Sequence, residues 1–180
     1  MAKSPETAVE ICRRRRMRIL NLRDFVSLIF RLALIVLAIS FLLSNVFIVT
    51  QSDGMGMFPA LEDGDLILGY RLETTFEKGD VVIYQRGDAV YIGRIVAFAT
   101  DTVMMDDSGK LLVNGTTQAG EIMYPTYAKE GIEYPYRVHE DHIFVLGDYR
   151  TQTQDSRDFG AIPMDDLLGK VITIVRRRGV

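Results

Sequence analysis

The segment Leu32–Thr50, LALIVLAISFLLSNVFIVT, divides the chain into two parts of different composition. Its nineteen residues contain no Asp, Glu, Lys or Arg. At about 1.5 Å of rise per residue, a helix of this length nearly matches the roughly 30 Å hydrocarbon core of a bilayer. The segment therefore predicts a transmembrane helix over residues 32–50 that anchors the chain in a membrane.

The charges on the two sides of this segment differ in sign. Residues 1–31 carry eight Lys or Arg and three Asp or Glu, a net charge of about +5, whereas residues 32–180 carry thirteen and twenty-one, about −8. Four consecutive arginines, Arg13 to Arg16, precede the apolar run. Basic residues beside a transmembrane helix stay in the cytoplasm. We therefore expect residues 1–31 to be a basic cytoplasmic segment and residues 51–180 to be an extracytoplasmic domain.

Other interpretations of the N-terminal region fit its residues less well. A cleaved signal peptide would have a shorter apolar stretch that ends in small residues, and Val46–Val49 offers no A-x-A site. A soluble core helix of such uniform apolarity is rare, and a basic run beside a membrane segment favours membrane orientation over nucleic-acid binding. Cys12, the only cysteine, lies on the expected cytoplasmic side, so the outer domain has no disulfide.

From residue 51 onward, short runs rich in β-branched and aromatic residues alternate with Gly and Asp. Such runs are typical of strands joined by turns. Asp106–Gly109 is predicted to be a hairpin turn in which Gly109 supplies a positive φ, and residues 118–140 a long loop. The fold class is thus mainly β: an antiparallel ectodomain after a single transmembrane helix, with residues 100–145 as a hairpin and loop insert. The predicted strands are residues 65–72, 80–85, 89–99, 102–105, 110–114, 142–146 and 169–175.

A second informative stretch, Leu146–Gly160, has the sequence LGDYRTQTQDSRDFG. It resembles the signature GDNR-x-x-S-x-DSR-x-FG of the type I signal peptidases, the membrane-anchored Ser/Lys endopeptidases that remove secretory signal peptides. The chain departs from this signature at Tyr149, which replaces Asn, and at Thr153, which replaces Ser. A gapped match of this length is specific. The matching residues are Gly147, Asp148, Arg150, Asp155, Ser156, Arg157, Phe159 and Gly160.

Further motifs follow in the order of that family. Gly56–Leu61 resembles the nucleophile motif S-M-x-P-T-L, and Lys78–Val82 resembles a K/R-G-D motif followed by apolar residues. Tyr91–Val96 resembles Y-x-K-R-V-I, and Asp107–Gly115 resembles the family's insert hairpin, which ends in V-N-G. The resemblance extends from the anchor to Gly169 and implies a signal-peptidase-like β fold.

The two departures that bear on chemistry fall on the catalytic pair of this family. The nucleophilic serine aligns with Gly56 and the general-base lysine aligns with Gly93. In the family's mechanism, a lysine kept neutral by burial takes the proton of the serine hydroxyl. Loss of such a pair costs on the order of a millionfold in turnover. The double loss therefore predicts that no intact catalytic site remains.

Few nearby residues can replace the lost pair. Ser52 stands four residues before Gly56, roughly 13 Å away along an extended chain. Arg94 does not deprotonate in a protein, and Asp53 has no evident partner. An active endopeptidase whose chemistry has moved to Ser52 or Lys78 is kept as an alternative hypothesis.

The retained motifs imply recognition without cleavage. In the family, the late signature is scaffold around the active site, and the nucleophile loop lines the groove for an extended peptide. Two flexible methionines in this loop suit an adaptable contact surface, and a bound peptide can pair with a strand edge. The structural motif comprises Gly147, Asp148, Arg150, Asp155, Ser156 and Arg157. The predicted peptide-binding groove comprises Met55, Met57, Phe58 and Pro59.

The double loss and the single anchor resemble one branch of this family in particular. Its members are catalytically silent proteins of Gram-positive bacteria that assist sortase-dependent pilus assembly. The resemblance implies a chaperone in the bacterial cell membrane that binds secreted or pilin segments, with a sortase as a further candidate partner. An accessory partner of a true signal peptidase is the second alternative. No cofactor or nucleic acid is expected. No metal is expected either, because His139 and His142 are interpreted as part of a solvated turn.

Overall fold

The computed structural model describes residues 8–118 and 123–176, with side chains from residue 22 onward. The chain forms two compact units that divide between Ser44 and Asn45. The first unit contains most of a long helix, and the second contains the strands and the short helices. Each unit is described separately below.

Helix α1 spans Ala8–Val46. Its part Leu22–Val46 is 25 residues long, has a mean hydropathy of 2.7 and is long and apolar enough to cross a membrane. The predicted bounds of 32–50 need correction at both ends. The helix continues through Arg23 and Arg31 because arginine is a good helix former. It ends before Thr50 because residues 47–51 pair as an edge strand, which β-branched side chains favour.

The larger sheet of the second unit has seven strands in the order β1-β2-β11-β3-β4-β9-β10, and every neighbouring pair is antiparallel. Buried residues alternate with more exposed ones in β2, whereas β3 and β9 each contain three or more consecutive buried residues. The strands are β1 (Phe47–Gln51), β2 (Leu66–Tyr70), β3 (Val81–Arg86), β4 (Ala89–Phe98), β9 (His142–Leu146), β10 (Ile162–Pro163) and β11 (Leu167–Val175).

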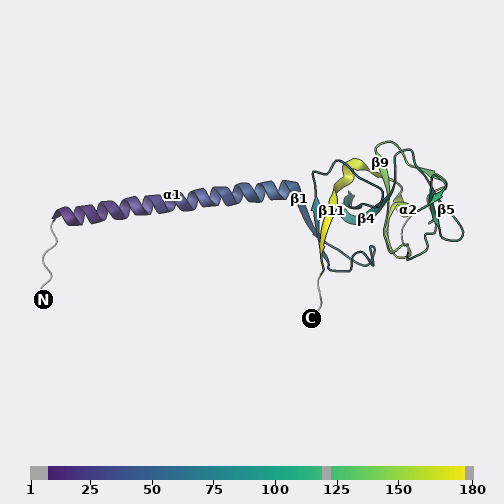
Figure 1. Cartoon of the computed structure of the whole chain (residues 1–180), viewed down its shortest axis with the longest axis horizontal. Helices are drawn as coiled ribbons and strands as arrows, with labels where there is room; N and C mark the ends of the chain where they lie inside the picture. The colour runs from purple at the N-terminus through teal and green to yellow at the C-terminus, as the bar shows by residue number, and fades with distance from the viewer. Residues whose placement is uncertain (1–7, 119–122, 177–180) are drawn as a thin grey trace. The chain divides into compact units, whose positions relative to one another are not determined.

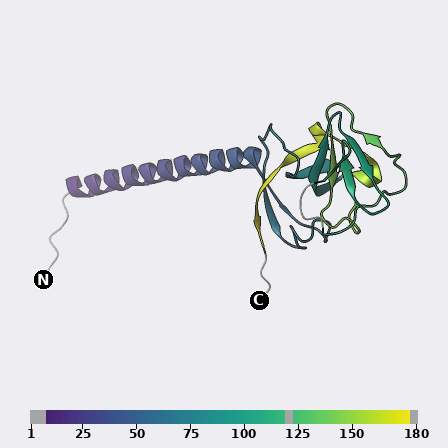
Figure 2. The same ribbon diagram turned by 45° about the vertical axis from the view of Figure 1, so that its right-hand side comes forward.

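The last strand, β11, lies between strands from the start of the domain. It pairs with β2 on one side and with β3 on the other. Figure 1 shows β11 in yellow beside the blue strand β1, with β5 at the far end of the domain. The rotated view in Figure 2 again places the yellow strand next to the chain around residues 47–70. The two ends of the domain sequence therefore close one sheet, which is a topology that short-range pattern does not reveal.

The smaller sheet is the insert predicted at residues 100–145. Its strands β5 (Thr102–Met105), β6 (Leu111–Val113), β7 (Thr116–Thr117) and β8 (Tyr136–Arg137) lie in the order β7-β6-β5-β8. The predicted hairpin turn is present. Asp106 Oδ1 accepts hydrogen bonds from the backbone N–H groups of Ser108 and Lys110, and Gly109 has a φ of 80°. Strand β8 lies inside the segment predicted as a loop.

A cluster of buried apolar side chains joins the two sheets. Val96 and Phe144 of the larger sheet pack with Val103 and Leu111 of the smaller one. Two further clusters fill the larger sheet, one around Tyr84 and Val145 and one around Ile67 and Ile83. This packing fixes the end of β9, and with it the loop that follows Leu146. The short helix α2 (Ser156–Phe159) and the 3-10 turn η1 (Met164–Asp166) complete the described unit.

The predicted fold class is confirmed, since the domain is built of antiparallel strands after an apolar helix. Every predicted strand is present to within two residues at each end. The four strands that the sequence analysis missed are β1, β7, β8 and β10.

Candidate functional site

The loop that carries Gly56 connects β1 to β2. Two backbone hydrogen bonds close its base, from Ser52 N–H to Asp65 O at 2.8 Å and from Gly64 N–H to Ser52 O at 3.0 Å. At its tip, Phe58 N–H donates to Met55 O at 2.9 Å and forms a tight turn around Gly56. The loop is thus held by its own backbone and presents residue 56 at a fixed place.

Gly56 packs against the segment that follows β9. Its carbonyl oxygen accepts a hydrogen bond from Tyr149 N–H at 3.0 Å. A Cβ atom at Gly147 would lie 2.6 Å from the same oxygen, so only glycine allows this close approach. A Cβ atom at Gly56 would lie 3.1 Å from Thr153 Oγ1. The Thr153 hydroxyl therefore lies where a side chain at residue 56 would begin.

Gly93 lies in β4, opposite Val82 of β3. A Cβ atom at this position would lie 2.4 Å from Val145 Cγ1 and 3.3 Å from Leu146 O. Val145 is fully buried and its branched side chain is confined by strand packing. The space into which a lysine would extend from residue 93 is therefore filled by Val145.

The structure thus brings both degenerate positions against one segment, residues 145–153. Gly56 faces Thr153 and Gly93 faces Val145. Neither glycine offers a hydroxyl, an amine or an acid. The Thr153 hydroxyl is oriented toward the carbonyl oxygen of Gln154, at 3.4 Å, and its residue is 9% exposed.

The described lysines do not provide a replacement general base, which would need apolar surroundings that favour the neutral amine. Lys78, Lys129 and Lys170 each contact a carboxylate at 2.7–2.8 Å, on Asp101, Asp158 and Asp80 respectively. Lys110 is exposed on the insert hairpin.

Lys129 and Lys170 illustrate how these amines are used instead. Lys129 also donates to Thr153 O at 2.5 Å and so holds the loop beside Gly56. The hydrogen bond with Asp80 raises the pKa of Lys170, which is the opposite of what a general base requires. These contacts stabilise the fold rather than prepare a proton transfer.

Helix α2 begins with a capping box at Asp155. One carboxylate oxygen of Asp155 accepts from the backbone N–H and the Nε of Arg157, and the other accepts from Gly147 N–H and from the Arg157 guanidinium at 2.8 Å. Arg157 also donates to Arg150 O at 2.6 Å. The predicted contact between Asp155 and Arg157 is present, and both side chains are buried.

These contacts position the loop against Gly56. Ser156 adds one more link, because its hydroxyl accepts from Val145 N–H at 2.9 Å. Buried ion pairs of this kind hold a specific geometry even where they add little net stability. Asp155, Ser156, Arg157 and Gly147 are thus scaffold that fixes residues 145–153.

A cavity of about 710 Å³ lies near this scaffold. Asp148 and Arg150 line it, with Arg94 from β4. Arg94 forms a two-point contact with Asp148, at 2.8 and 2.5 Å, and this contact raises the pKa of Arg94. Further lining comes from Pro59, Ala60, Lys78, Gly79, Ile95, Val96, Val113, Thr116, Thr117, Gln118 and Met123.

The sequence model of the signal peptidase family, peptidase S26, matches residues 22–176. The chain belongs to this family. It is 34% identical over 132 residues to "Probable thylakoidal processing peptidase 2, chloroplastic" of Arabidopsis thaliana, an alignment that covers 64% of this chain and 34% of that one. It is also 33% identical over 121 residues to "Signal peptidase I" of Bacillus licheniformis, covering 59% of this chain and 63% of that one.

The chain therefore spans about a third of the length of the Arabidopsis relative and just under two thirds of the length of the Bacillus relative. A crystal structure of a signal peptidase I from Enterococcus faecalis V583 is 23% identical, covers 56% of this chain and 98% of that chain, and superposes with a TM-score of 0.46. The family resemblance predicted from the late signature is confirmed by the match over residues 22–176.

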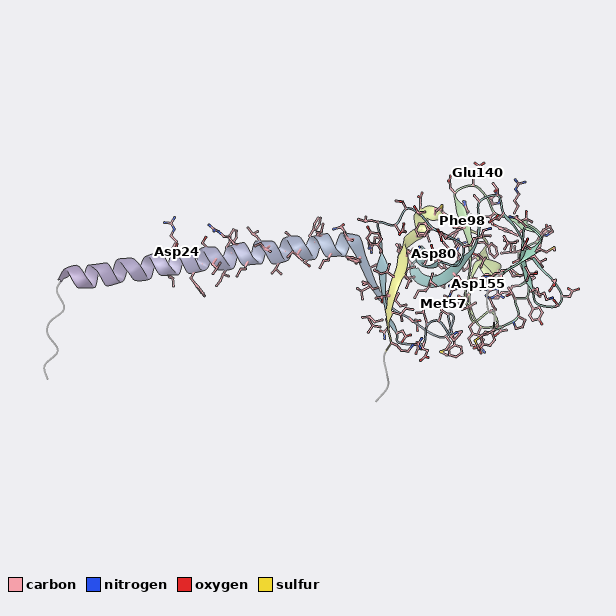
Figure 3. The ribbon with its side chains drawn as sticks, viewed as in Figure 1. Asp24, Met57, Asp80, Phe98, Glu140 and Asp155 are labelled. Carbon is pink, nitrogen blue, oxygen red and sulfur yellow. The ribbon has the colours of Figure 1, made fainter. Side chains whose placement is uncertain are left out.

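One predicted groove residue of this peptidase S26 chain needs correction. Met57 is 3% exposed and packs in the core with Leu61 and Ile67, so it is not available to a ligand. Figure 3 shows Met57 and Asp155 within the domain, whereas Glu140 projects from its margin. The tight turn from Met55 to Phe58 leaves Met55 exposed and Met57 buried.

The other predicted groove residues are accessible. Met55 is 42% exposed, and Pro59 is exposed and lines the cavity. Phe58 is half-buried, and its ring lies 6.2 Å from that of Tyr149. Tyr149 in turn packs on Tyr124 with ring centroids 4.4 Å apart. An aromatic cluster therefore stands beside the Gly56 loop.

Several residues around the site were not identified as functional from the sequence. Val145 and Lys129 belong to none of the motifs identified in the sequence. Thr116 and Thr117 form a strand of only two residues, which is too short to give a sequence pattern. Of these neighbouring residues, only Thr153 stood out in the sequence, because it departs from the family signature. Within the described part of the chain, no group of three or more His, Cys, Asp or Glu side chains is arranged to hold a metal ion, and His142 Nδ1 contacts Glu140 O at 2.7 Å.

Proposed function

We propose that this protein is a non-catalytic, membrane-anchored member of the peptidase S26 family that binds extended segments of secreted or pilin proteins and assists sortase-dependent pilus assembly. One observation is the main support for the proposed loss of catalysis. Both positions of the Ser/Lys pair are glycine, and the spaces beside them are taken by Thr153 and Val145. A peptide carbonyl placed there would meet no activated nucleophile.

The retained scaffold supports a binding role. The buried pair of Asp155 and Arg157 and the closed loop around Gly56 keep the geometry of the site although its chemistry is gone. Exposed Met55 and the nearby cavity offer apolar and polar surface to an extended chain. The pilus assignment comes from the resemblance to the catalytically silent branch of the family.

The anchor supports a membrane location for this role. The apolar stretch Leu22–Val46 is long enough to span a bilayer, and the arginine run precedes it. We propose that the N-terminus is cytoplasmic and the β domain extracytoplasmic, in a single pass through a bacterial cell membrane. Protease added to intact spheroplasts should then digest the β domain and spare an N-terminal epitope.

The rival function is peptidase activity with relocated chemistry, and the names of the relatives favour it. The decisive test incubates the full-length protein, in detergent, with a preprotein that an active signal peptidase cleaves. We expect no cleavage above the rate without protein. Cleavage that disappears in Ser52→Ala or Lys78→Ala would establish the rival and overturn our proposal.

A matched set of variants tests whether restoring the Ser/Lys pair is enough to restore cleavage. Gly56→Ser/Gly93→Lys restores the pair, and adding Val145→Ala removes the side chain that lies 2.4 Å from a Cβ at residue 93. We expect the triple variant to cleave faster than the double variant. Equal inactivity of both, with unchanged folding by circular dichroism, would show that more than the pair has been lost.

The binding role is tested in cells. Deletion of the gene should abolish pilus polymerisation while general secretion continues, and the tagged protein should co-purify with pilin. Co-purification with an active signal peptidase, together with a general secretion defect, would instead establish an accessory role for this protein.

A further inference from the structure

The cavity of about 710 Å³ carries an excess of positive charge. Among the residues that the structure describes, three basic side chains line it, on Lys78, Arg94 and Arg150, against one acid, Asp148. The part of the chain to which it belongs, residues 32–180, has thirteen basic and twenty-one acidic residues. A basic cavity in an acidic domain is a local feature that overall composition does not explain.

Two of the three cations have carboxylate partners within the chain. Arg94 forms its two-point contact with Asp148, and Lys78 Nζ lies 2.8 Å from Asp101 Oδ2. Their charges are therefore largely balanced. Arg150 differs from both.

Arg150 is 3% exposed, and its guanidinium hydrogen-bonds to two neutral side chains, while the carboxylates of Asp148 and Asp155 act on its charge without a direct ion pair. Its guanidinium donates to Thr126 Oγ1 at 2.8 Å and to Gln118 Oε1 at 3.2 Å. Its Nε has no hydrogen-bond partner, and no carboxylate within residues 8–118 and 123–176 forms an ion pair with it. Burial lowers the pKa of Arg150 to about 10, so it remains charged at neutral pH. A buried charge without a counterion costs folding free energy.

The cavity also borders an open strand edge. Thr116 and Thr117 form β7, which pairs with β6 and is the outermost described strand of the smaller sheet. Both residues are exposed and line the cavity. An extended peptide can add to such an edge by backbone hydrogen bonds, and alternate side chains then point to the same side.

We infer that this cavity is a carboxylate subsite: it takes an aspartate or glutamate side chain of the extended segment that the protein binds, with Arg150 as its counterion. A carboxylate matches the planar guanidinium of an arginine that borders the cavity. The apolar lining from Val96, Val113 and Met123 would contact neighbouring residues of the same segment. The inference depends on the proposed binding function, since it specifies what that function recognises.

The first test observes Arg150 directly. Full-length protein in detergent micelles is labelled with ¹⁵N-arginine, and the Arg150 Nε–H signal is assigned by its absence in Arg150→Met. Sodium acetate should shift this signal saturably, while sodium chloride at equal ionic strength should not. No saturable shift with acetate would overturn the inference. A shift that inorganic phosphate produces at much lower concentration than acetate would also overturn it, in favour of a phosphate site.

The second test measures specificity with matched variants. Lys78→Met removes a cation that lines the cavity, and Lys110→Met removes one that is exposed on the hairpin and does not line it. Acetate affinity should fall about 3- to 10-fold in Lys78→Met and stay unchanged in Lys110→Met. Equal affinity in both variants would show that the ion binds by general charge, as an adventitious ion only.

The third test separates this inference from the function on which it rests. A pilin that co-purifies with the protein is converted, one acid at a time, from Glu to Gln and from Asp to Asn. We expect one such change to weaken binding about 10-fold or more. If pilin binds but no acid matters, the carboxylate subsite fails and the proposed function stands. If no pilin or secreted segment binds while acetate still shifts Arg150, the proposed function fails instead.

Discussion

Arg150, in the loop after β9, and Arg157, in helix α2, stand seven residues apart and are similarly buried, at 3% and 1% exposure. Arg157 contacts the carboxylate of Asp155 through two of its nitrogens, so its charge is balanced inside the protein. Arg150 donates its side-chain hydrogen bonds to the neutral Thr126 and Gln118, and it borders a cavity. The comparison separates a charge used to hold the fold from a charge left available to a ligand.

The same contrast applies to the wider site. At the corner around Gly56 and Gly93, the atoms that a side chain would meet belong to Thr153 and Val145. The neighbouring cavity keeps its polar groups and its volume. This difference between a filled corner and an open cavity is the physical basis of the function that we propose for this member of the peptidase S26 family.

The largest expected effect compares one substitution at the two arginines. Arg157→Met leaves Asp155 as a buried carboxylate without its counterion and should lower the free energy of unfolding by about 3–5 kcal/mol. Urea unfolding of the full-length protein in detergent, followed by tyrosine fluorescence, measures this change. A loss below about 1 kcal/mol would show that Arg157 is no more structural than Arg150 and would remove the contrast.

The second prediction concerns the filled corner. Gly93→Ala places a Cβ atom 2.4 Å from Val145 Cγ1 and should lower the free energy of unfolding by about 1–3 kcal/mol. Val145→Ala removes that atom, so the two changes should be less than additive when combined. Additive losses in the double-mutant cycle would mean that Val145 does not occupy the space beside Gly93. Gly87→Ala is the control for backbone strain without steric crowding. Gly87 has a φ of 60°, and a Cβ atom at this residue would meet no atom within 4 Å.

The third prediction is the counterpart of the first. Arg150→Met replaces a buried, unpaired charge by an apolar side chain of similar length and should change the free energy of unfolding by less than about 1 kcal/mol, in either direction. The variant should stay folded and lose its stabilisation by acetate, measured as the shift in thermal unfolding midpoint that wild type shows. A loss as large as that expected for Arg157→Met would assign Arg150 to the scaffold.

Much of this architecture follows from local sequence pattern. The main strands and the hairpin turn at Gly109 were predicted because β-branched runs and turn residues act over a few positions. Strands β7, β8 and β10 were missed because two residues carry no periodicity, and β1 was missed because its apolar residues continue those of helix α1. Only pairing with β2 separates strand from helix there.

The candidate site was predictable in one respect and not in another. The sequence predicts that Gly56 and Gly93 stand at the places of the Ser/Lys pair, because each lies within a motif that resembles one of the family. The cavity is not visible, because Lys78, Arg94 and Arg150 meet only through pairing between strands distant in the chain. Met57 was misassigned to the groove, since sequence cannot show which way a turn directs a side chain.

The smallest expected effect tests whether Asp101 limits the positive charge of the cavity through Lys78. Burial opposes ionisation of Asp101, but hydrogen bonds from Lys78, the Phe98 N–H and Asn114 outweigh it and lower the pKa of Asp101. A carboxylate with a lowered pKa stabilises the fold at pH values above its unfolded pKa of about 3.9, and this stabilisation is lost as the pH falls through the folded value. Asp101→Asn should therefore reduce stability at neutral pH slightly and flatten the acid limb of the stability curve.

Asp101→Asn should also strengthen acetate binding about 2- to 5-fold, because it frees the charge of Lys78 toward the cavity. Weaker acetate binding in Asp101→Asn, with Asp107→Asn as an exposed control, would show that Lys78 does not act on this ligand.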